Sequence, residues 1–205
     1  MRRTVALLLL LASAPLAAQG KAIDPRVTRA DLARIEGKPT AKHWILIVSD
    51  FQCPYCKEFH DKTAALVRKE FVQTGIARLA YIHFPLRIHP NAVPAAEASM
   101  CAAAQGKFWP FHDRLFATQP RWAGEQNPEP TYQTFARELG LALPEYEQCM
   151  RDDVMIPMIQ ADYQRGVQVG VGSTPTILVD NIKLDGNAPI GSIRRAMQQV
   201  RAAAR

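Results

Sequence analysis

The sequence predicts an α/β domain in which a strand, a helix and a second strand are followed by a helical block, a β-hairpin and a last helix. Three observations lead to this prediction. A strand–helix–strand pattern fills about 40 residues from His43, the size of a crossover unit that favours parallel strands. Helical patterns then occupy about 80 residues, and strand signals return only near the end of the chain.

The first two strands and the helix between them are predicted from their apolar patterns. HWILIVSD, from His43 to Asp50, is a short apolar run rich in branched residues, which suits a buried strand. From Cys56 to about Thr74 apolar residues recur every three to four positions, which predicts an amphipathic helix ended by Gly75. ARLAYIHF, residues 77–84, predicts the second strand.

The helical block runs from Asn91 to about Val171, and we place an insertion at about residues 90–171. Its helical patterns are ASMCAAAQG, KFWPFHDRLFATQ, TYQTFARELG and a longer one that contains Pro157, with PRWAGEQNPEP as the clearest loop. TPTILVD and NIKLDG then predict a hairpin with its turn at Asp180 and Asn181. PIGSIRRAMQQVRAAA predicts a closing helix.

The stretch FQCPYCKEF places two cysteines at the junction between the first strand and the helix. Unpaired amide donors and the positive end of the helix dipole favour negative charge there, and such surroundings lower a cysteine pKa to roughly 3.5–7.5. Pro54 suits the first helical turn because its missing N–H costs nothing. We therefore expect Cys53 to be the reactive thiolate and Cys56 to be the more buried resolving thiol.

The chain resembles the DsbA-like thiol:disulfide oxidoreductases in stretches spread along most of its length. These stretches are SDFQCPYCKEFH, FPLRIHPNAVPAAEASMCAAAQGKFWPFHDRLF and GVGSTPTILVDN. The resemblance implies a thioredoxin fold with an inserted helical subdomain and catalysis by the Cys53/Cys56 pair. It also implies that the Thr174–Pro175 bond is cis and lies beside Cys53. The substrate-binding residues that we expect are Pro54, Tyr55, Thr174 and Pro175.

A zinc site is the main alternative for the two cysteines. Cys53, Cys56 and His60 have usable ligand spacing, and a fourth ligand could come from another histidine (His83, His89 or His112). A structural zinc site usually has a second paired set, which this chain lacks. We therefore expect no metal and no cofactor. We expect His60 to be an exposed helix residue. The aromatic side chains of FWPFHDRLF are expected in the core.

Cys101 and Cys149 remain after the first pair is assigned, and both lie in the helical block. Two buried free thiols are one interpretation, because cysteine packs well as a small hydrophobe. An oxidising compartment instead tends to pair an even number of cysteines, and pairing with Cys53 or Cys56 would disable the redox site. We therefore predict a structural Cys101–Cys149 disulfide.

The compartment is predicted from the first 20 residues, MRRTVALLLLLASAPLAAQG. Two arginines, an apolar run and a small-residue region have the layout of a cleaved secretory signal. The apolar run ends at Ala12, too short for the roughly 20 residues of a transmembrane helix. We expect cleavage between Ala18 and Lys21, which would leave residues 21–205 as one domain in the periplasm.

Charge gives little support for a nucleic-acid partner. The formal net charge is +6 for the whole chain, or about +4 without Arg2 and Arg3, and the basic residues are scattered rather than gathered in a stripe. The expected partners are exported proteins with cysteine thiols and a membrane redox protein that resets the disulfide.

The direction of electron flow is less well defined by the sequence. Pro54 and Tyr55 between the cysteines also occur in glutaredoxin-like and isomerase-like relatives, and they differ from the Pro-His pair of the strongest oxidants. Residues 21–42 are too few for the separate domain of the known dimeric isomerases. We expect a monomeric oxidase first, an isomerase or reductase second, and a redox-inactive peptide-binding module as an alternative of another class.

Overall fold

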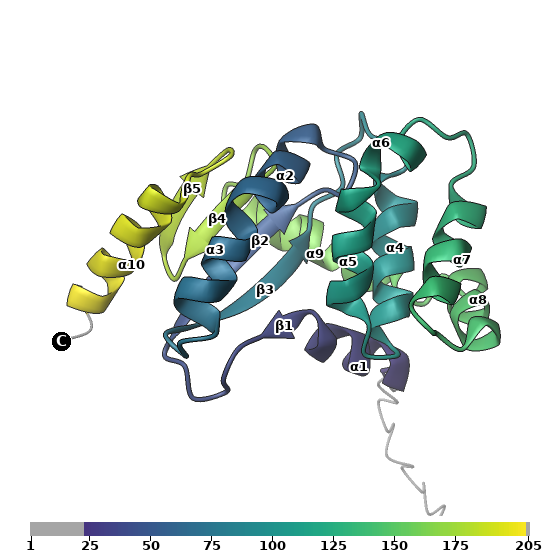
Figure 1. The fold of residues 1–205 in the computed structure, drawn as a ribbon, viewed down its shortest axis with the longest axis horizontal. Helices are drawn as coiled ribbons and strands as arrows, with labels where there is room; N and C mark the ends of the chain where they lie inside the picture. Colours follow the sequence, from purple (N-terminus) through teal and green to yellow (C-terminus); the bar gives the residue numbers. More distant parts are fainter. Residues whose placement is uncertain (1–22, 204–205) are drawn as a thin grey trace, which may run out of the picture.

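A five-stranded mixed sheet forms the centre of the protein in the computed structural model, which describes residues 23–203 (Figure 1). Its strands are β1 (Ile35–Glu36), β2 (His43–Ser49), β3 (Ala77–His83), β4 (Thr176–Val179) and β5 (Ile182–Asp185), in the order β1-β3-β2-β4-β5. β2 and β3 are parallel, and the other neighbours are antiparallel. The predicted secretory signal lies outside the described residues.

The parallel pair at the centre follows from two apolar strands that are joined by a helical crossover. Ile45 of β2 lies opposite Leu79 of β3, and Ile47 lies opposite Tyr81. All four side chains are buried and, because alternate residues of a strand share a face, they form one covered face of the sheet. The predicted strand–helix–strand unit is confirmed.

One nearly continuous helical run connects β2 to β3. It comprises α2 (Pro54–Phe59), the π-helical turn η1 (His60–Ala64), α3 (Ala65–Val67) and a second π-helical turn η2 (Arg68–Val72). The run ends before Gly75, whose φ of 77° is available to glycine at little cost. The last helix, α10 (Ile190–Ala203), lies beside this run, where Arg194 binds Glu70 at 2.6 Å.

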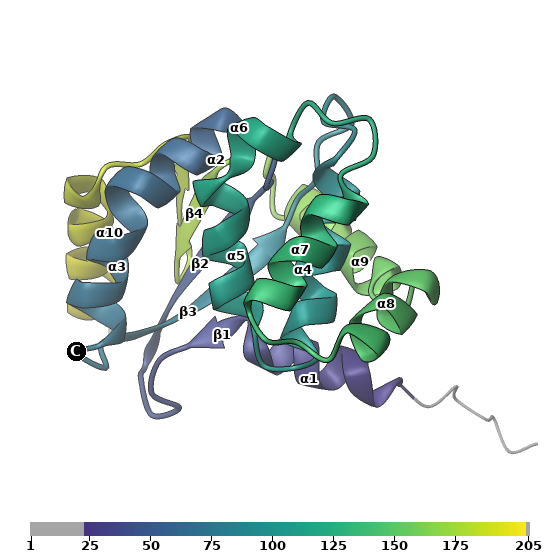
Figure 2. The same ribbon diagram turned by 45° about the vertical axis from the view of Figure 1, so that its right-hand side comes forward.

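Six helices between β3 and β4 form the insertion, to one side of the sheet (Figure 2). They are α4 (Ala92–Ala103), α5 (Phe108–Ala117), α6 (Gln119–Trp122), α7 (Glu129–Glu138), α8 (Leu143–Arg151) and α9 (Ile156–Gln168). α9 returns to pack against β3, on the face of the sheet away from α2 and α3 (Figure 1).

The structure corrects the helical prediction in two places. The long pattern with Pro157 divides into α8 and α9 at a turn, where Asp153 has a φ of 51°, and Pro157 lies in the first turn of α9. Proline suits that position because its missing N–H would be unpaired anyway. The sequence interpretation also lacked α1 (Pro25–Ala33), which packs on α4 and α5.

An aromatic cluster joins the insertion to the sheet. Phe51 stacks on Tyr81 with ring centroids 4.9 Å apart, and it contacts Phe116 of α5 at 5.1 Å. Phe108 of α5 also contacts Tyr81, so most of the FWPFHDRLF aromatic side chains are core, as predicted. Among residues 23–203, no helix is long and apolar enough to cross a membrane.

Candidate active site

Cys53 and Cys56 lie where the carboxyl end of β2 meets the amino end of α2. Cys53 is the N-cap of α2 and Pro54 is its first residue, so the sequence places the pair at a helix start as expected. Both cysteines are free thiols and both are buried. Tyr55, between them, is 64% exposed.

The two thiols have opposite electrostatic environments. The pKa of Cys53 is lowered to about 6, first by a hydrogen bond from Cys56 and further by Thr174 and by the backbone amides of Cys56 and Tyr55. Burial works against this shift but does not cancel it. Burial raises the pKa of Cys56 well above its ordinary value. At neutral pH Cys53 is therefore a thiolate that Cys56 stabilises as a donor.

Thr174 and Pro175 lie beside the redox pair, where the family resemblance placed them. The Cys53 thiol is 3.5 Å from the carbonyl oxygen of Thr174, and the Thr174–Pro175 peptide bond is cis. The Thr174 hydroxyl is buried and has no hydrogen-bond partner in the structure. It is therefore free to donate to the thiolate, which is how it helps to lower the Cys53 pKa.

A buried carboxylate that the sequence reasoning missed fixes the turn before the cysteines. Asp50 accepts hydrogen bonds from the amides of Gln52 and Leu86, at 2.7 and 2.9 Å, and its Oδ2 atom is 2.7 Å from Nδ1 of His89. Its own backbone N–H points to the Cys56 sulfur at 3.5 Å. The sequence did contain a signal for this role, because Asp50 ends an apolar strand and a carboxylate buried there needs hydrogen-bond partners.

A second missed residue, Gln119 of α6, holds the same turn from the insertion. Its side-chain amide donates to the carbonyl oxygens of Phe51 and Cys53, at 2.6 and 3.0 Å. The backbone N–H of Asn91 also donates to the Gln52 side-chain oxygen at 2.7 Å. These contacts join segments about 40 to 70 positions apart in the chain, and no local pattern identifies them.

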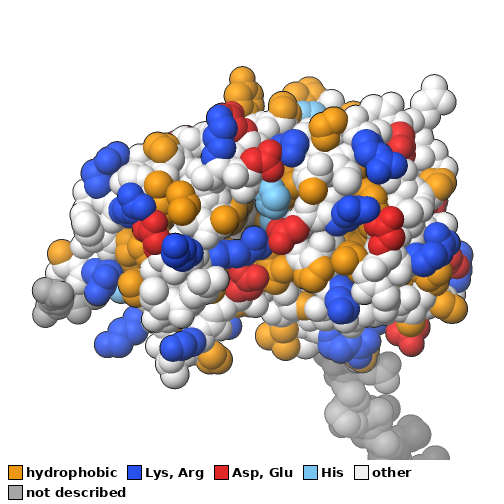
Figure 3. Space-filling view, viewed as in Figure 1, with side chains coloured by type: hydrophobic (Ala, Val, Ile, Leu, Met, Phe, Trp, Pro, Cys, Tyr) orange, Lys and Arg blue, Asp and Glu red, His pale blue; other side chains and the backbone are white. Residues whose placement is uncertain are grey.

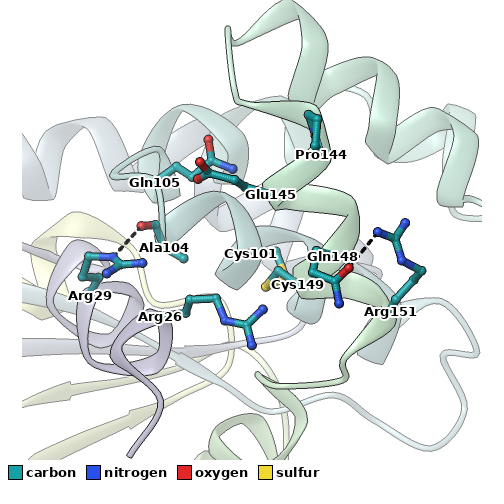
Figure 4. A pocket seen from close by; sticks show the side chains of 10 residues that line it. All are labelled: Arg26, Arg29, Cys101, Ala104, Gln105, Pro144, Glu145, Gln148, Cys149 and Arg151. Atoms are coloured by element: carbon teal, nitrogen blue, oxygen red, sulfur yellow. Dashed lines mark hydrogen bonds between the residues drawn. A yellow bond between two sulfur atoms is a disulfide. The ribbon is translucent and has the colours of Figure 1, made fainter.

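Cys101 and Cys149 form a disulfide between α4 and α8, with their Cα atoms 5.7 Å apart, within the range that such a bond spans. Both residues are buried, yet a surface pocket reaches the bond. Figure 4 shows this pocket, whose rim carries Arg26, Arg29 and Arg151. The redox cysteines are not among its lining residues.

The histidines do not gather around the redox pair. His89 pairs with Asp50, whereas His60 lies near His112 and Asp113 of α5. The expectation that His60 is exposed is wrong, because its side chain is only 18% exposed and stacks on Phe116. Burial lowers the pKa of His112 to about 4 and lowers that of His83 well below its ordinary value.

The comparisons with known proteins agree with this geometry. A family model described as Thioredoxin matches residues 30–199. The chain belongs to the thioredoxin family. Among solved structures, it superposes on oxidised BdbD from Bacillus subtilis with a TM-score of 0.73 at 20% identity, covering 81% of this chain and 91% of that one. For DsbA of Chlamydia trachomatis the TM-score is 0.71 at 22% identity, covering 83% and 92%. The fold of this family member is thus DsbA-like, with a helical insertion, as predicted.

Curated relatives of this thioredoxin-family chain are longer proteins. A Na⁺/H⁺ antiporter NhaA 3 of Salinispora tropica is 31% identical over 184 residues, which are 89% of this chain and 26% of the antiporter. The chain therefore spans about a quarter of the length of these curated relatives.

Proposed function

We propose that this chain is a periplasmic thiol:disulfide oxidoreductase that acts mainly as an oxidase, transferring the Cys53–Cys56 disulfide to exported proteins. The observation that carries the proposal is the position of Cys53 at the start of α2, with its pKa lowered to about 6. A thiolate stabilised in this way favours the dithiol form of the pair, so the disulfide form is oxidising.

The proposed reaction uses two exchange steps. A substrate thiolate attacks the Cys53 sulfur of the oxidised pair, the Cys53–Cys56 bond breaks, and Cys56 leaves as a thiolate that takes up a proton. A second substrate thiolate then attacks the substrate sulfur of the mixed disulfide and releases Cys53 as a thiolate. The substrate loses two electrons and two protons. The enzyme pair gains both electrons, Cys56 takes up one proton, and the other proton goes to water.

Cys53 is the leaving group of the second step, and its low pKa speeds that release because a more acidic thiol leaves faster. The Thr174 carbonyl oxygen lies 3.5 Å from the Cys53 sulfur. We propose that Pro54, Tyr55, Thr174 and Pro175 hold the substrate chain. The reduced enzyme is then reoxidised by a membrane redox protein. We propose that it works as a monomer.

Two other functions use the same fold, and specific observations keep both open. A Cys53 pKa of about 6 lies towards the upper part of the roughly 3.5–7.5 range of such thiols. A thiolate that is stabilised only this far gives a less oxidising disulfide, which also suits an isomerase or a reductase. A redox-inactive peptide-binding module would use only the surface around Tyr55 and Pro175.

The deciding experiment measures the reduction potential of Cys53/Cys56 against glutathione, together with the refolding of a reduced, disulfide-containing substrate. We expect a potential above that of thioredoxin, about −270 mV, and faster refolding with the oxidised protein. A potential at or below that value, with insulin reduction, would favour a reductase. Ordinary Cys53 reactivity and no acceleration in either assay would leave only the binding module.

A further inference from the structure

We propose that His60, His112 and Asp113 form a binding site for a divalent transition-metal ion, with Zn²⁺ as the expected occupant. Among the described residues, these three form the one group of three or more His, Cys, Asp and Glu side chains whose ligand atoms all lie within 4.8 Å of one another. His60 comes from η1, and the other two are neighbours in α5. The proposal is independent of the redox function and replaces our sequence-based expectation that the chain binds no metal.

The distances between the ligand atoms suit a tetrahedral ion. With metal–ligand bonds of about 2.0–2.1 Å, neighbouring ligands of a tetrahedral zinc site are about 3.3 Å apart. Oδ1 of Asp113 lies 3.2 Å from Nε2 of His60 and 2.8 Å from Nδ1 of His112. Both of these distances lie within about half an ångström of the tetrahedral separation, and the two histidine nitrogens lie within 4.8 Å of each other.

The hydrogen bonds of His60 provide a second argument. Its Nδ1 atom lies 3.0 Å from Asp61, while Nε2 faces Asp113, so both ring nitrogens point at carboxylates. A protonated imidazole donates to both carboxylates, whereas a neutral one has a single N–H and donates to only one of them. Donation to Asp61 leaves the Nε2 lone pair facing a carboxylate, and a cation between the two removes that repulsion. A carboxylate behind the ring is also the usual arrangement for a metal-binding histidine.

Arg68 is the group that competes with a cation at this position. Its Nη1 atom is 3.4 Å from Oδ1 of Asp113, but the guanidinium has other partners. Nε donates to Glu36 at 2.9 Å, and the group lies over the Trp109 ring, 4.5 Å from its centroid. Arg68 can therefore release Asp113 while keeping both of those contacts.

Solvent access leaves a place for a further ligand. The Asp113 side chain is 48% exposed, whereas His112 is buried, so the ion would be bound at the protein surface with water completing its shell. Figure 3 shows acidic and basic side chains interspersed over this face, with a histidine at the surface near its centre. Two imidazole nitrogens and one carboxylate suit Zn²⁺, Ni²⁺ and Cu²⁺ rather than Ca²⁺ or Mg²⁺.

Binding of ZnCl₂ is best measured by isothermal titration calorimetry on protein whose Cys53–Cys56 disulfide is formed, because free thiols would bind zinc themselves. A Cys53→Ser/Cys56→Ser variant is the second form of the same test. We expect one ion per chain in both. Addition of Co²⁺ should give the visible absorption of a tetrahedral N/O site without a thiolate band.

Variants then assign the ligands. His60→Gln is the decisive variant because this side chain is partly exposed and its loss need not disturb the core. The substitution should weaken zinc binding by more than about 100-fold. Loss of a residue that only supports a ligand costs roughly 10- to 100-fold in metal affinity. Asp61→Asn should weaken binding about tenfold. Arg68→Met should strengthen it, since a competing cation is removed.

The matched control is His43→Gln, which removes another histidine that contacts a carboxylate, Asp180, at 2.7 Å. This variant should bind zinc like the parent protein. The proposal is overturned if the oxidised protein binds no zinc at one ion per chain, or if folded His60→Gln, verified by circular dichroism, binds it with unchanged affinity.

Discussion

The two cysteine pairs differ in where their helices place them, although burial is nearly the same for all four residues. Cys53 is the N-cap residue of α2, and the nearby backbone amides help to lower its pKa. Cys101 and Cys149 lie in the last turns of α4 and α8, where the helix dipole disfavours a thiolate. The first pair are free thiols and the second pair are bonded. Helix position, rather than exposure, therefore separates a reactive cysteine from a structural one.

The largest effect that tests this comparison is expected from Cys56→Ser. Without the resolving thiol, turnover should stop, and mixed disulfides should accumulate on Cys53 because its thiolate character is kept in part. Non-reducing electrophoresis with mass spectrometry of the trapped chains measures this. Cys53→Ser is the control and should trap nothing. Recovery of no mixed disulfides from folded Cys56→Ser would contradict the assigned roles.

Replacing Cys101 and Cys149 together by alanine should affect stability instead of turnover. The bond closes a loop of 48 residues, and in the loop-entropy model its loss costs about 4 kcal/mol of unfolding free energy. Urea unfolding of the oxidised parent and the double variant measures the difference. Redox activity below the unfolding transition should remain. A loss of activity with unchanged stability would mean that the Cys101–Cys149 bond serves the reaction rather than the stability of the fold.

Most of the fold could be predicted because its signals are local. The apolar run of β2, the periodic helix after Cys56 and the hairpin at Asp180 each lie within one short window. β1 is two residues long, and α1 has few apolar residues, so neither produces a clear pattern. The two π-helical turns between Phe59 and Gln73 likewise have no sequence signature at this level.

The candidate site divides in the same way. The cysteines and Thr174–Pro175 were found through a motif and a resemblance. Asp50 and Gln119 were not, because their roles depend on partners that only folding brings near. His60 was misjudged for the same reason, since a helical pattern cannot show that α5 covers it. The sequence does not reveal the tertiary contacts between the insertion and the turn that carries Cys53 and Cys56.

The pH dependence sharpens the contrast between the two thiols of the redox pair. Alkylation of Cys53 in the reduced protein should be half-maximal near pH 6, as its pKa is about 6, and should fall about tenfold for each pH unit below that value. Rates with iodoacetamide from pH 4 to 8 measure this. A midpoint near the ordinary value of 9.0 would contradict the thiolate assignment.

Stability of the reduced protein should follow the same titration. Because folding lowers the Cys53 pKa, the stabilisation is present near and above pH 9 and is lost as the pH falls through 6. Reduced protein should therefore gain unfolding free energy relative to the oxidised form between pH 6 and 9. Above pH 9 the gain from Cys53 should stop because its thiol is then ionised in the unfolded chain as well. Stability should fall at higher pH, since folding raises the pKa of Cys56 and keeps that thiol protonated.

The smallest effect is expected from Thr174→Val, which keeps the shape of the side chain but removes its hydroxyl. The hydroxyl ranks below the Cys56 hydrogen bond among the groups that lower the Cys53 pKa. A hydrogen bond to a charged group contributes about 1.5 kcal/mol, so the pKa should rise by about one unit. Thiolate absorbance at 240 nm against pH measures it. Thr134→Val is the matched control, because that hydroxyl binds Pro130 on α7 and should leave the titration unchanged. An unshifted Cys53 pKa in Thr174→Val would mean that the helix amides and Cys56 stabilise the thiolate without help from the residue before Pro175.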